Sequence, residues 1–143
     1  MRPISKKRQF MEEFDLGRFL TAQNNLTGHG TTVYEQSLIE LREGYLSIHC
    51  WIRYIFPQML GLGTSSVTNF YGIRGREEAK AYIEHPLLKE RLINATLAVL
   101  DSGKTIYEIL GIDAMRFRAC MLLFASVSDE PLFKRVVAQY RWR

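Results

Sequence analysis

Polar side chains that could bind a ligand lie among large apolar residues in one stretch of this 143-residue chain. The stretch covers residues 45–63, YLSIHCWIRYIFPQMLGLG, and combines large apolar residues with a histidine, an arginine and a glutamine. An aromatic surface, a cation for an anionic group and polar groups that fix orientation are usual components of a small-ligand pocket. We therefore predict a pocket lined by His49, Trp51, Arg53 and Gln58.

The residues after this stretch could extend the predicted pocket. Residues 61–66, GLGTSS, could hold a phosphate with successive backbone N–H groups. They lack the lysine of a P-loop and follow no predicted strand, so a helix end and a loop explain them better. Tyr71 and Arg74 flank this loop, and we add both to the predicted site, with Arg74 as a second cation.

Each of these residues also has an ordinary structural explanation. Trp51 could lie in the core, Arg53 could extend its charged end to the surface, and His49 could bind a backbone carbonyl. Cys50 adjoins a histidine, but neighbours on a helix point apart, and Cys120 lies in an apolar run where burial makes a thiol inert. The histidines and cysteines match no metal-ligand spacing, so we predict no metal and no cofactor.

The positive net charge of +4 is concentrated at the two ends of the chain. Residues 1–8 and 141–143 hold six of the 19 basic residues and no acid, which leaves 13 basic and 15 acidic residues over 9–140. A nucleic-acid-binding domain needs a basic face on its folded body. The charge distribution therefore argues against a nucleic-acid partner and leaves a small anionic ligand as the predicted one.

The apolar segments are too short for a membrane protein, since a spanning helix needs about 20 apolar residues. The basic start of the chain is not followed by the apolar segment of a secretory signal. Two cysteines in a domain of this length do not form a disulfide framework. We therefore predict a cytoplasmic protein without a membrane partner, of an oligomeric state that the sequence does not specify.

Helical periodicity and helix-end residues recur along the chain. They predict an all-α, irregular single-domain bundle of about eight short helices over residues 14–140, after a basic lead-in at 1–13. Asp15 is the expected N-cap of the first helix, and residues 61–70 are expected to form a loop and a turn. The other helices are expected at 33–43, in the central stretch, and at 76–84, 86–101, 105–111, 114–127 and 131–140.

Pro57 divides the central stretch, because proline lacks the N–H that a continuing helix needs. We predict a helix that breaks near Phe56 and a short second segment that begins at Pro57 and ends at Gly61. A β-strand is the alternative, since the stretch is rich in β-branched and aromatic residues.

Six segments occur in an order that is similar to a known family. They are FDLGRFLTAQ, YEQSLIELREG, WIRYIFPQMLGLGTSS, YGI, EEAKAYIEHPLLKERL and DAMRFRACMLLFASV. Over residues 14–137 the chain thus resembles the largely bacterial family catalogued as domain of unknown function 1810. The resemblance implies an all-helical fold and supplies no function. The family usually has Ser-His-Trp-x-Trp before IFPQ, whereas this chain has Cys50 in place of that histidine and Arg53 in place of the second tryptophan.

Three functions are compatible with the sequence. The first is a small ligand-binding module with its pocket near WIRYIFPQ. The second is an enzyme that acts on a nucleotide-derived or other anionic molecule, such as ADP-ribose, with His49, Arg53 and Arg74 in its site. The third is a protein-interaction domain without a small ligand. One cleft shared by His49, Arg53, Gln58 and Arg74 would favour the first two, and a large exposed apolar patch would favour the third.

Overall fold

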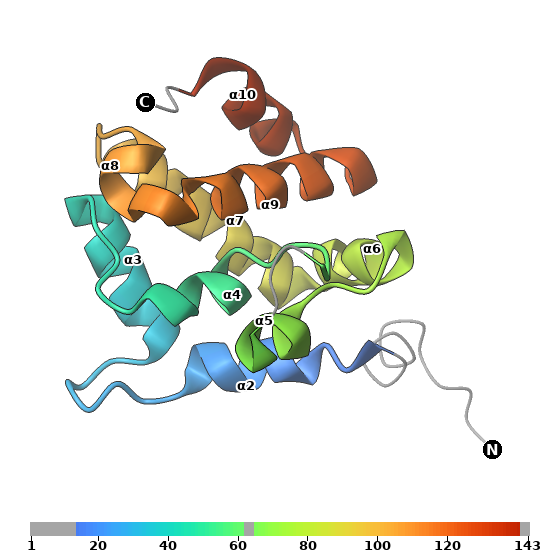
Figure 1. Cartoon of the computed structure of the whole chain (residues 1–143), viewed down its shortest axis with the longest axis horizontal. Helices are drawn as coiled ribbons and strands as arrows, with labels where there is room; N and C mark the ends of the chain where they lie inside the picture. The colour runs from blue at the N-terminus through green and yellow to red at the C-terminus, as the bar shows by residue number, and fades with distance from the viewer. Residues whose placement is uncertain (1–13, 62–64, 141–143) are drawn as a thin grey trace.

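The computed structural model describes residues 14–61 and 65–140, and within them the predicted all-α fold is confirmed. The predicted lead-in at 1–13 lies outside the described residues. β-Structure in the described part is limited to two isolated bridges, Leu26 with Thr32 and Met59 with Ile73. The helical elements in chain order (Figure 1) are α2 (Gly17–Asn24), α3 (Val33–Glu43), η1 (His49–Trp51), α4 (Ile52–Ile55), α5 (Ser66–Tyr71), α6 (Arg76–Glu84), α7 (Pro86–Asp101), α8 (Ile106–Leu110), η2 (Gly111–Asp113), α9 (Ala114–Val127) and α10 (Pro131–Gln139).

Residue types at the helix ends explain most of these bounds. Thr32 and Glu35 form a reciprocal capping box at the start of α3, with hydrogen bonds of 3.1 and 3.0 Å. Thr105 and Glu108 repeat this arrangement at the start of α8. Gly44 ends α3 with a φ of 94°, a left-handed conformation that glycine adopts without strain. Local sequence alone therefore accounts for these helix ends.

A chain of aromatic rings joins helices from the two ends of the sequence. Phe19 on α2 meets Tyr82 on α6 edge to face, with ring centroids 5.0 Å apart. Tyr82 in turn contacts Phe124 on α9 at 5.2 Å, and Phe124 contacts Phe133 on α10 at 6.1 Å. All four side chains are fully buried, and each such pair adds about 0.5–1.5 kcal/mol beyond the area that it buries. In Figure 1, α9 and α10 accordingly lie on one side of the bundle, and α2 and α5 lie on the other.

The start of α2 differs from the prediction. Asp15 was expected to cap the helix, but the N-cap position is Leu16 and no side chain caps the helix. Asp15 instead has a φ of 51°, which is rare for a residue other than glycine. The cause is Arg18, whose backbone N–H and guanidinium both donate to the Asp15 carbonyl, at 3.2 and 2.9 Å. The expected cap at Asp15 is therefore wrong.

The central stretch is helical only up to Phe56. The 3-10 turn η1 leads into the single turn of α4, and the helix break near Phe56 is confirmed. The helical segment expected after Pro57 does not form, because the backbone there bonds to a distant segment. Ile73 donates its N–H to the Gln58 carbonyl at 2.8 Å, and Leu60 donates to the Ile73 carbonyl at 2.7 Å.

A helix replaces part of the loop that was expected over residues 61–70. Ser65 caps α5 by accepting a hydrogen bond from the Thr68 N–H at 3.1 Å. Residues 62–64 of the possible phosphate loop lie outside the described part of the chain. No helix among residues 14–61 and 65–140 is long and apolar enough to cross a membrane.

Candidate functional site

Three of the predicted site residues meet around Asp113, at the start of α9. The Nδ1 atom of His49 lies 3.4 Å from Asp113 Oδ2, and Nη1 of Arg53 lies 4.0 Å from Asp113 Oδ1. Arg116 lies closest to the carboxylate, with its Nε 3.2 Å from Oδ1. Arg116 also donates through Nη1 to Oε1 of Gln58 at 3.4 Å. We call these five residues the Asp113 cluster.

The Asp113 cluster holds two guanidinium groups and one carboxylate. Arg53 donates through Nε to Oγ1 of Thr68 at 3.0 Å, but its buried Nη1 has no hydrogen-bond partner. Burial lowers the pKa of Arg53, and the nearby charge of Arg116 lowers it further, while Asp113 acts in the opposite direction. The cluster therefore carries more positive than negative charge and could attract an anionic group.

Space is the feature that the Asp113 cluster lacks. The cavity beside Arg53, Gln58 and Thr68 has a volume of about 10 Å³, which is room for a single water molecule. His49 lies outside this cavity, with 76% of its side chain exposed. The cluster could therefore contact a ligand only from its outer face, through His49.

Of the other predicted residues, Tyr71 also lines this small cavity, whereas Trp51 and Arg74 do not. Trp51 is a core residue with 9% of its surface exposed. Tyr71 is half-buried and packs against Tyr54 and Phe70, with ring centroids 4.8 Å away in both cases. Arg74 is exposed and lines a separate cavity of about 140 Å³. The structure therefore brings Arg53, Gln58 and Tyr71 together at the small cavity, with His49 on the outer side of the Asp113 cluster, and leaves Trp51 and Arg74 out of the site.

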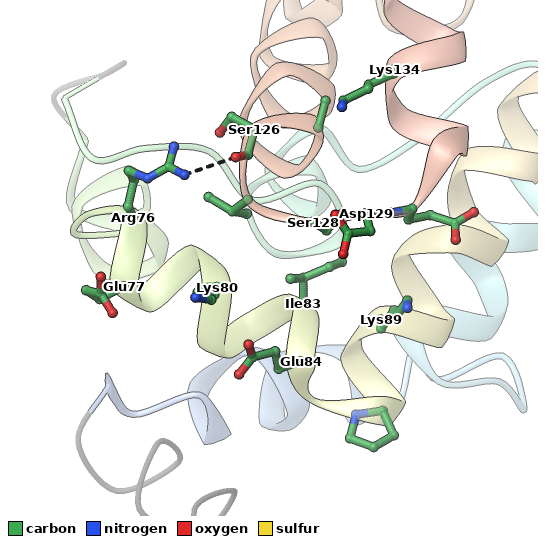
Figure 2. A pocket seen from close by; sticks show the side chains of 14 residues that line it. Arg76, Glu77, Lys80, Ile83, Glu84, Lys89, Ser126, Ser128, Asp129 and Lys134 are labelled. Carbon is green, nitrogen blue, oxygen red and sulfur yellow. Dashed lines mark hydrogen bonds between the residues drawn. The ribbon is translucent and has the colours of Figure 1, made fainter.

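The largest cavity that we describe lies between α6, α7, α9 and α10 (Figure 2) and has a volume of about 900 Å³. We call it the polar cavity, because charged side chains line most of it above an apolar base that includes the buried Ile83. Its cations are Arg76, Lys80, Lys89 and Lys134, and its acids are Glu77, Glu84, Asp129 and Glu130.

Hydrogen bonds at the end of α9 fix one edge of the polar cavity. Arg76 reaches from α6 and donates to the Ser126 carbonyl at 3.1 Å, the bond drawn dashed in Figure 2. The Ser126 hydroxyl donates to the Leu123 carbonyl at 2.6 Å, and the Ser128 hydroxyl donates to the Phe124 carbonyl at 2.9 Å. These bonds satisfy carbonyl groups at the end of α9, and one of them engages the guanidinium of Arg76.

Three lysines face the polar cavity from three different helices. Lys80 belongs to α6, Lys89 to α7 and Lys134 to α10. The ion pairs that join described residues include none of the three. In Figure 2 the acidic side chains of Glu77 and Glu84 point away from Ser126 across the opening. The lysine ammonium groups are therefore available to a ligand.

Comparison with known proteins places the chain in a family. Residues 13–142 match the family model described as protein of unknown function (DUF1810). The chain belongs to the DUF1810 family. A solved structure, that of the conserved hypothetical protein Rv1873 from Mycobacterium tuberculosis, is 39% identical in sequence. The match covers 90% of this chain and 88% of that chain, with a TM-score of 0.79. No curated protein matches the chain.

Cys50, where the family resemblance led us to expect a histidine, is an exposed free cysteine. The Nδ1 atom of the neighbouring His49 lies 3.4 Å from Asp113 Oδ2.

The sequence did not reveal the polar cavity. Its three lysines lie 9 and 45 residues apart along the chain, and each looks like an ordinary exposed residue on an amphipathic helix. The only local signal was their place off the apolar stripes, which every solvated lysine shares. Their convergence depends on how α6 and α10 pack against α9.

Proposed function

We propose that this DUF1810 protein binds a small anionic molecule in the polar cavity. The observation that carries the proposal is the convergence of Lys80, Lys89 and Lys134 from three helices on one opening. The volume of about 900 Å³ lies within the range of roughly 300–1,000 Å³ that is common for small-ligand sites. Long, flexible lysine side chains can adjust to a phosphate or a carboxylate group.

The acids of the cavity narrow the ligand class. Asp129 and Glu130 line the polar cavity beside α10, so a simple polyanion would meet carboxylates as well as lysines. A ligand that combines an anionic group with hydroxyl or amino donors would satisfy both kinds of side chain. Nucleotide-derived molecules and sugar phosphates have this combination, and ADP-ribose is one example.

The proposed ligand is anionic, as the sequence predicted, but we propose that it binds in the polar cavity and not near WIRYIFPQ. The Asp113 cluster has the charge for an anion, but its cavity of about 10 Å³ cannot enclose a nucleotide. We propose binding rather than turnover, because the hydroxyl groups of Ser126 and Ser128 in the lining both donate to backbone carbonyls and not to a general base.

A thermal-shift screen followed by calorimetric titration tests the proposal. The panel contains inorganic phosphate, ribose 5-phosphate, AMP and ADP-ribose. We expect at least one of the organic phosphates to raise the melting temperature, with an effect that weakens as salt screens the lysines. Lys134→Ala should then weaken binding about tenfold, which corresponds to roughly 1.4 kcal/mol for one charged contact.

Arg135→Ala is the matched control, because Arg135 is the next residue on α10, is equally cationic and exposed, and does not line the cavity. Equal loss of affinity in both variants would indicate general electrostatic attraction and would contradict the proposal. Loss in Arg53→Ala with full affinity in Lys134→Ala would place the ligand at the Asp113 cluster. Absence of binding across the panel would also count against the proposal.

A further inference from the structure

The small cavity beside the Asp113 cluster excludes an organic ligand but has room for a single ion. Its volume is about 10 Å³, and a monatomic ion is close in size to the one water molecule that such a volume holds. The described residues that line it are Arg53, Gln58, Met59, Thr68, Tyr71 and Gly72. One of these six side chains is a cation, and none is an acid. We call this space the Arg53 cavity.

The hydroxyl of Thr68 brings a hydrogen-bond donor to the Arg53 cavity. A hydroxyl can accept two hydrogen bonds and donate one. Thr68 Oγ1 accepts from Nε of Arg53 at 3.0 Å and from the hydroxyl of Ser65 at 2.9 Å. Both acceptor positions are therefore in use, and the O–H group needs an acceptor of its own. Thr68 exposes only 5% of its surface, so that acceptor must lie inside the protein.

Arg53 and Gln58 bring further N–H groups to the same cavity. Nη1 of Arg53 is buried and has no hydrogen-bond partner among the described residues. Gln58 exposes 5% of its surface and donates one N–H of its amide group to the Phe56 carbonyl at 2.6 Å. The hydrogen bonds between described residues leave its second N–H without an acceptor. Buried donors without an acceptor are costly and rare in folded proteins, so three of them around one cavity indicate that the cavity binds an acceptor.

An anion satisfies these donors better than a water molecule does. The amide oxygen of Gln58 already accepts from Nη1 of Arg116 at 3.4 Å, and Oγ1 of Thr68 accepts two bonds. A water molecule would therefore find few acceptors for its own two hydrogens, whereas an anion only accepts. An anion also balances charge, because Arg53 and Arg116 share the single carboxylate of Asp113.

We propose that the Arg53 cavity binds one halide ion, of which chloride is the common biological example. Arg53 belongs to α4, Thr68 belongs to α5, and Gln58 lies in the segment between these helices. The ion accepts hydrogen bonds from all three and so joins α4 to α5, which pack against each other (Figure 1). Chloride at this site stabilises the fold where the central helix ends. The site is separate from the polar cavity and does not depend on the ligand proposed there.

Crystals of the wild-type protein soaked in sodium bromide test the position of the ion. Bromide replaces chloride at halide sites and is located by its anomalous X-ray scattering. We expect an anomalous peak in the Arg53 cavity, at hydrogen-bonding distance from Nη1 of Arg53 and Oγ1 of Thr68. A cavity that holds only ordered water in these crystals would overturn the proposal.

Thermal unfolding in sodium chloride and in sodium gluconate at equal ionic strength tests the site in solution, because gluconate is too large for the cavity. At about 100 times its Kd, chloride should raise the melting temperature of the wild type by about 5–10 °C relative to gluconate. Thr68→Val keeps the shape of the side chain and removes the hydroxyl donor. It should raise the Kd for chloride, obtained from the dependence of the melting temperature on chloride concentration, about tenfold.

Thr96→Val is the matched control. Thr96 is also buried, donates its hydroxyl to the Leu92 carbonyl at 2.8 Å and does not line the Arg53 cavity. This variant should keep the chloride dependence of the wild type. Equal loss in both variants, or a wild type that chloride stabilises no more than gluconate does, would overturn the proposal. So would bromide that binds at crystal concentration only. If Thr68→Val does not fold, the two wild-type experiments still decide the question.

Discussion

Arg18 and Arg53 both lie largely inside the protein, but their guanidinium groups differ in how completely they are hydrogen-bonded. Arg18 forms a two-point ion pair with Glu78, with distances of 3.0 and 3.1 Å between nitrogen and oxygen atoms. The two side chains expose only 6% and 2% of their surface. Arg18 also donates to four backbone carbonyls, those of Phe14, Asp15, Phe70 and Gly72, and its Nη1 shares two N–H groups among three acceptors. Arg53, by contrast, shares one carboxylate with Arg116 and keeps a buried nitrogen without an acceptor.

Arg18 has all its hydrogen-bonding groups paired and holds parts of the fold together, whereas Arg53 has one buried nitrogen without a partner. Arg18 lies on α2. It bonds to Phe70 in α5, to Gly72 just after α5 and to Glu78 on α6, all of which are more than 50 residues away in sequence. A buried ion pair of this kind costs much to desolvate, so removing one partner is far more harmful than replacing both. Arg53 lies in a cluster with surplus positive charge, where its removal relieves repulsion as well as breaking a hydrogen bond.

The largest effect is expected for Glu78→Gln. The amide keeps the length of the side chain but leaves the guanidinium of Arg18 buried without a counter-charge. We expect a loss of about 3–5 kcal/mol in the free energy of unfolding, measured by urea denaturation. Glu77→Gln changes the adjacent, exposed acid and should stay within about 0.5 kcal/mol of the wild type. If Glu78→Gln cost no more than Glu77→Gln, Arg18 would not have the architectural role that we assign to it.

The contrast between the two arginines also shows what the sequence could predict. The helices at 33–43, 76–84, 86–101 and 114–127 were predicted correctly, because each has local end signals such as Thr32 or Pro86. The failures at Asp15 and after Pro57 both involve hydrogen bonds that the local pattern does not indicate. The Asp15 carbonyl accepts from Arg18, whose guanidinium is paired with Glu78, and the Gln58 carbonyl accepts from the distant Ile73.

In the Asp113 cluster, too, the contacts between residues close in sequence could be predicted and the contacts between distant residues could not. Arg53 and Gln58 are close in sequence, so their meeting could be predicted from one stretch. Asp113 and Arg116, which complete their cluster, are more than 50 residues away and carry no local sign of that role. The Arg18–Glu78 pair spans 60 residues and was missed for the same reason.

A smaller effect is expected for Asp113→Asn. This change removes the carboxylate that lies 3.2 Å from Arg116 and 4.0 Å from Arg53. The three side chains are partly solvated, with exposed fractions of 13–21%, so we expect a loss of about 1–2 kcal/mol rather than the full cost of a buried pair. Chemical denaturation at low and high salt measures it. The loss should shrink at high salt, because salt screens the repulsion between the two arginines; a loss as large as that of Glu78→Gln would erase the distinction between the two regions.

The smallest effect, and the sharpest test, is expected for Arg53→Met. Methionine keeps the apolar stem and removes a desolvated charge, so the lost hydrogen bond to Thr68 is partly offset and the net change should stay below about 1 kcal/mol. In the Asp113→Asn background the same substitution should become stabilising, because Arg53 then meets only the like charge of Arg116. A double-mutant cycle measured by urea denaturation gives this coupling. Additive effects would mean that Asp113 does not hold the two arginines together, and the Asp113 cluster would then be a group of neighbours rather than an interacting unit.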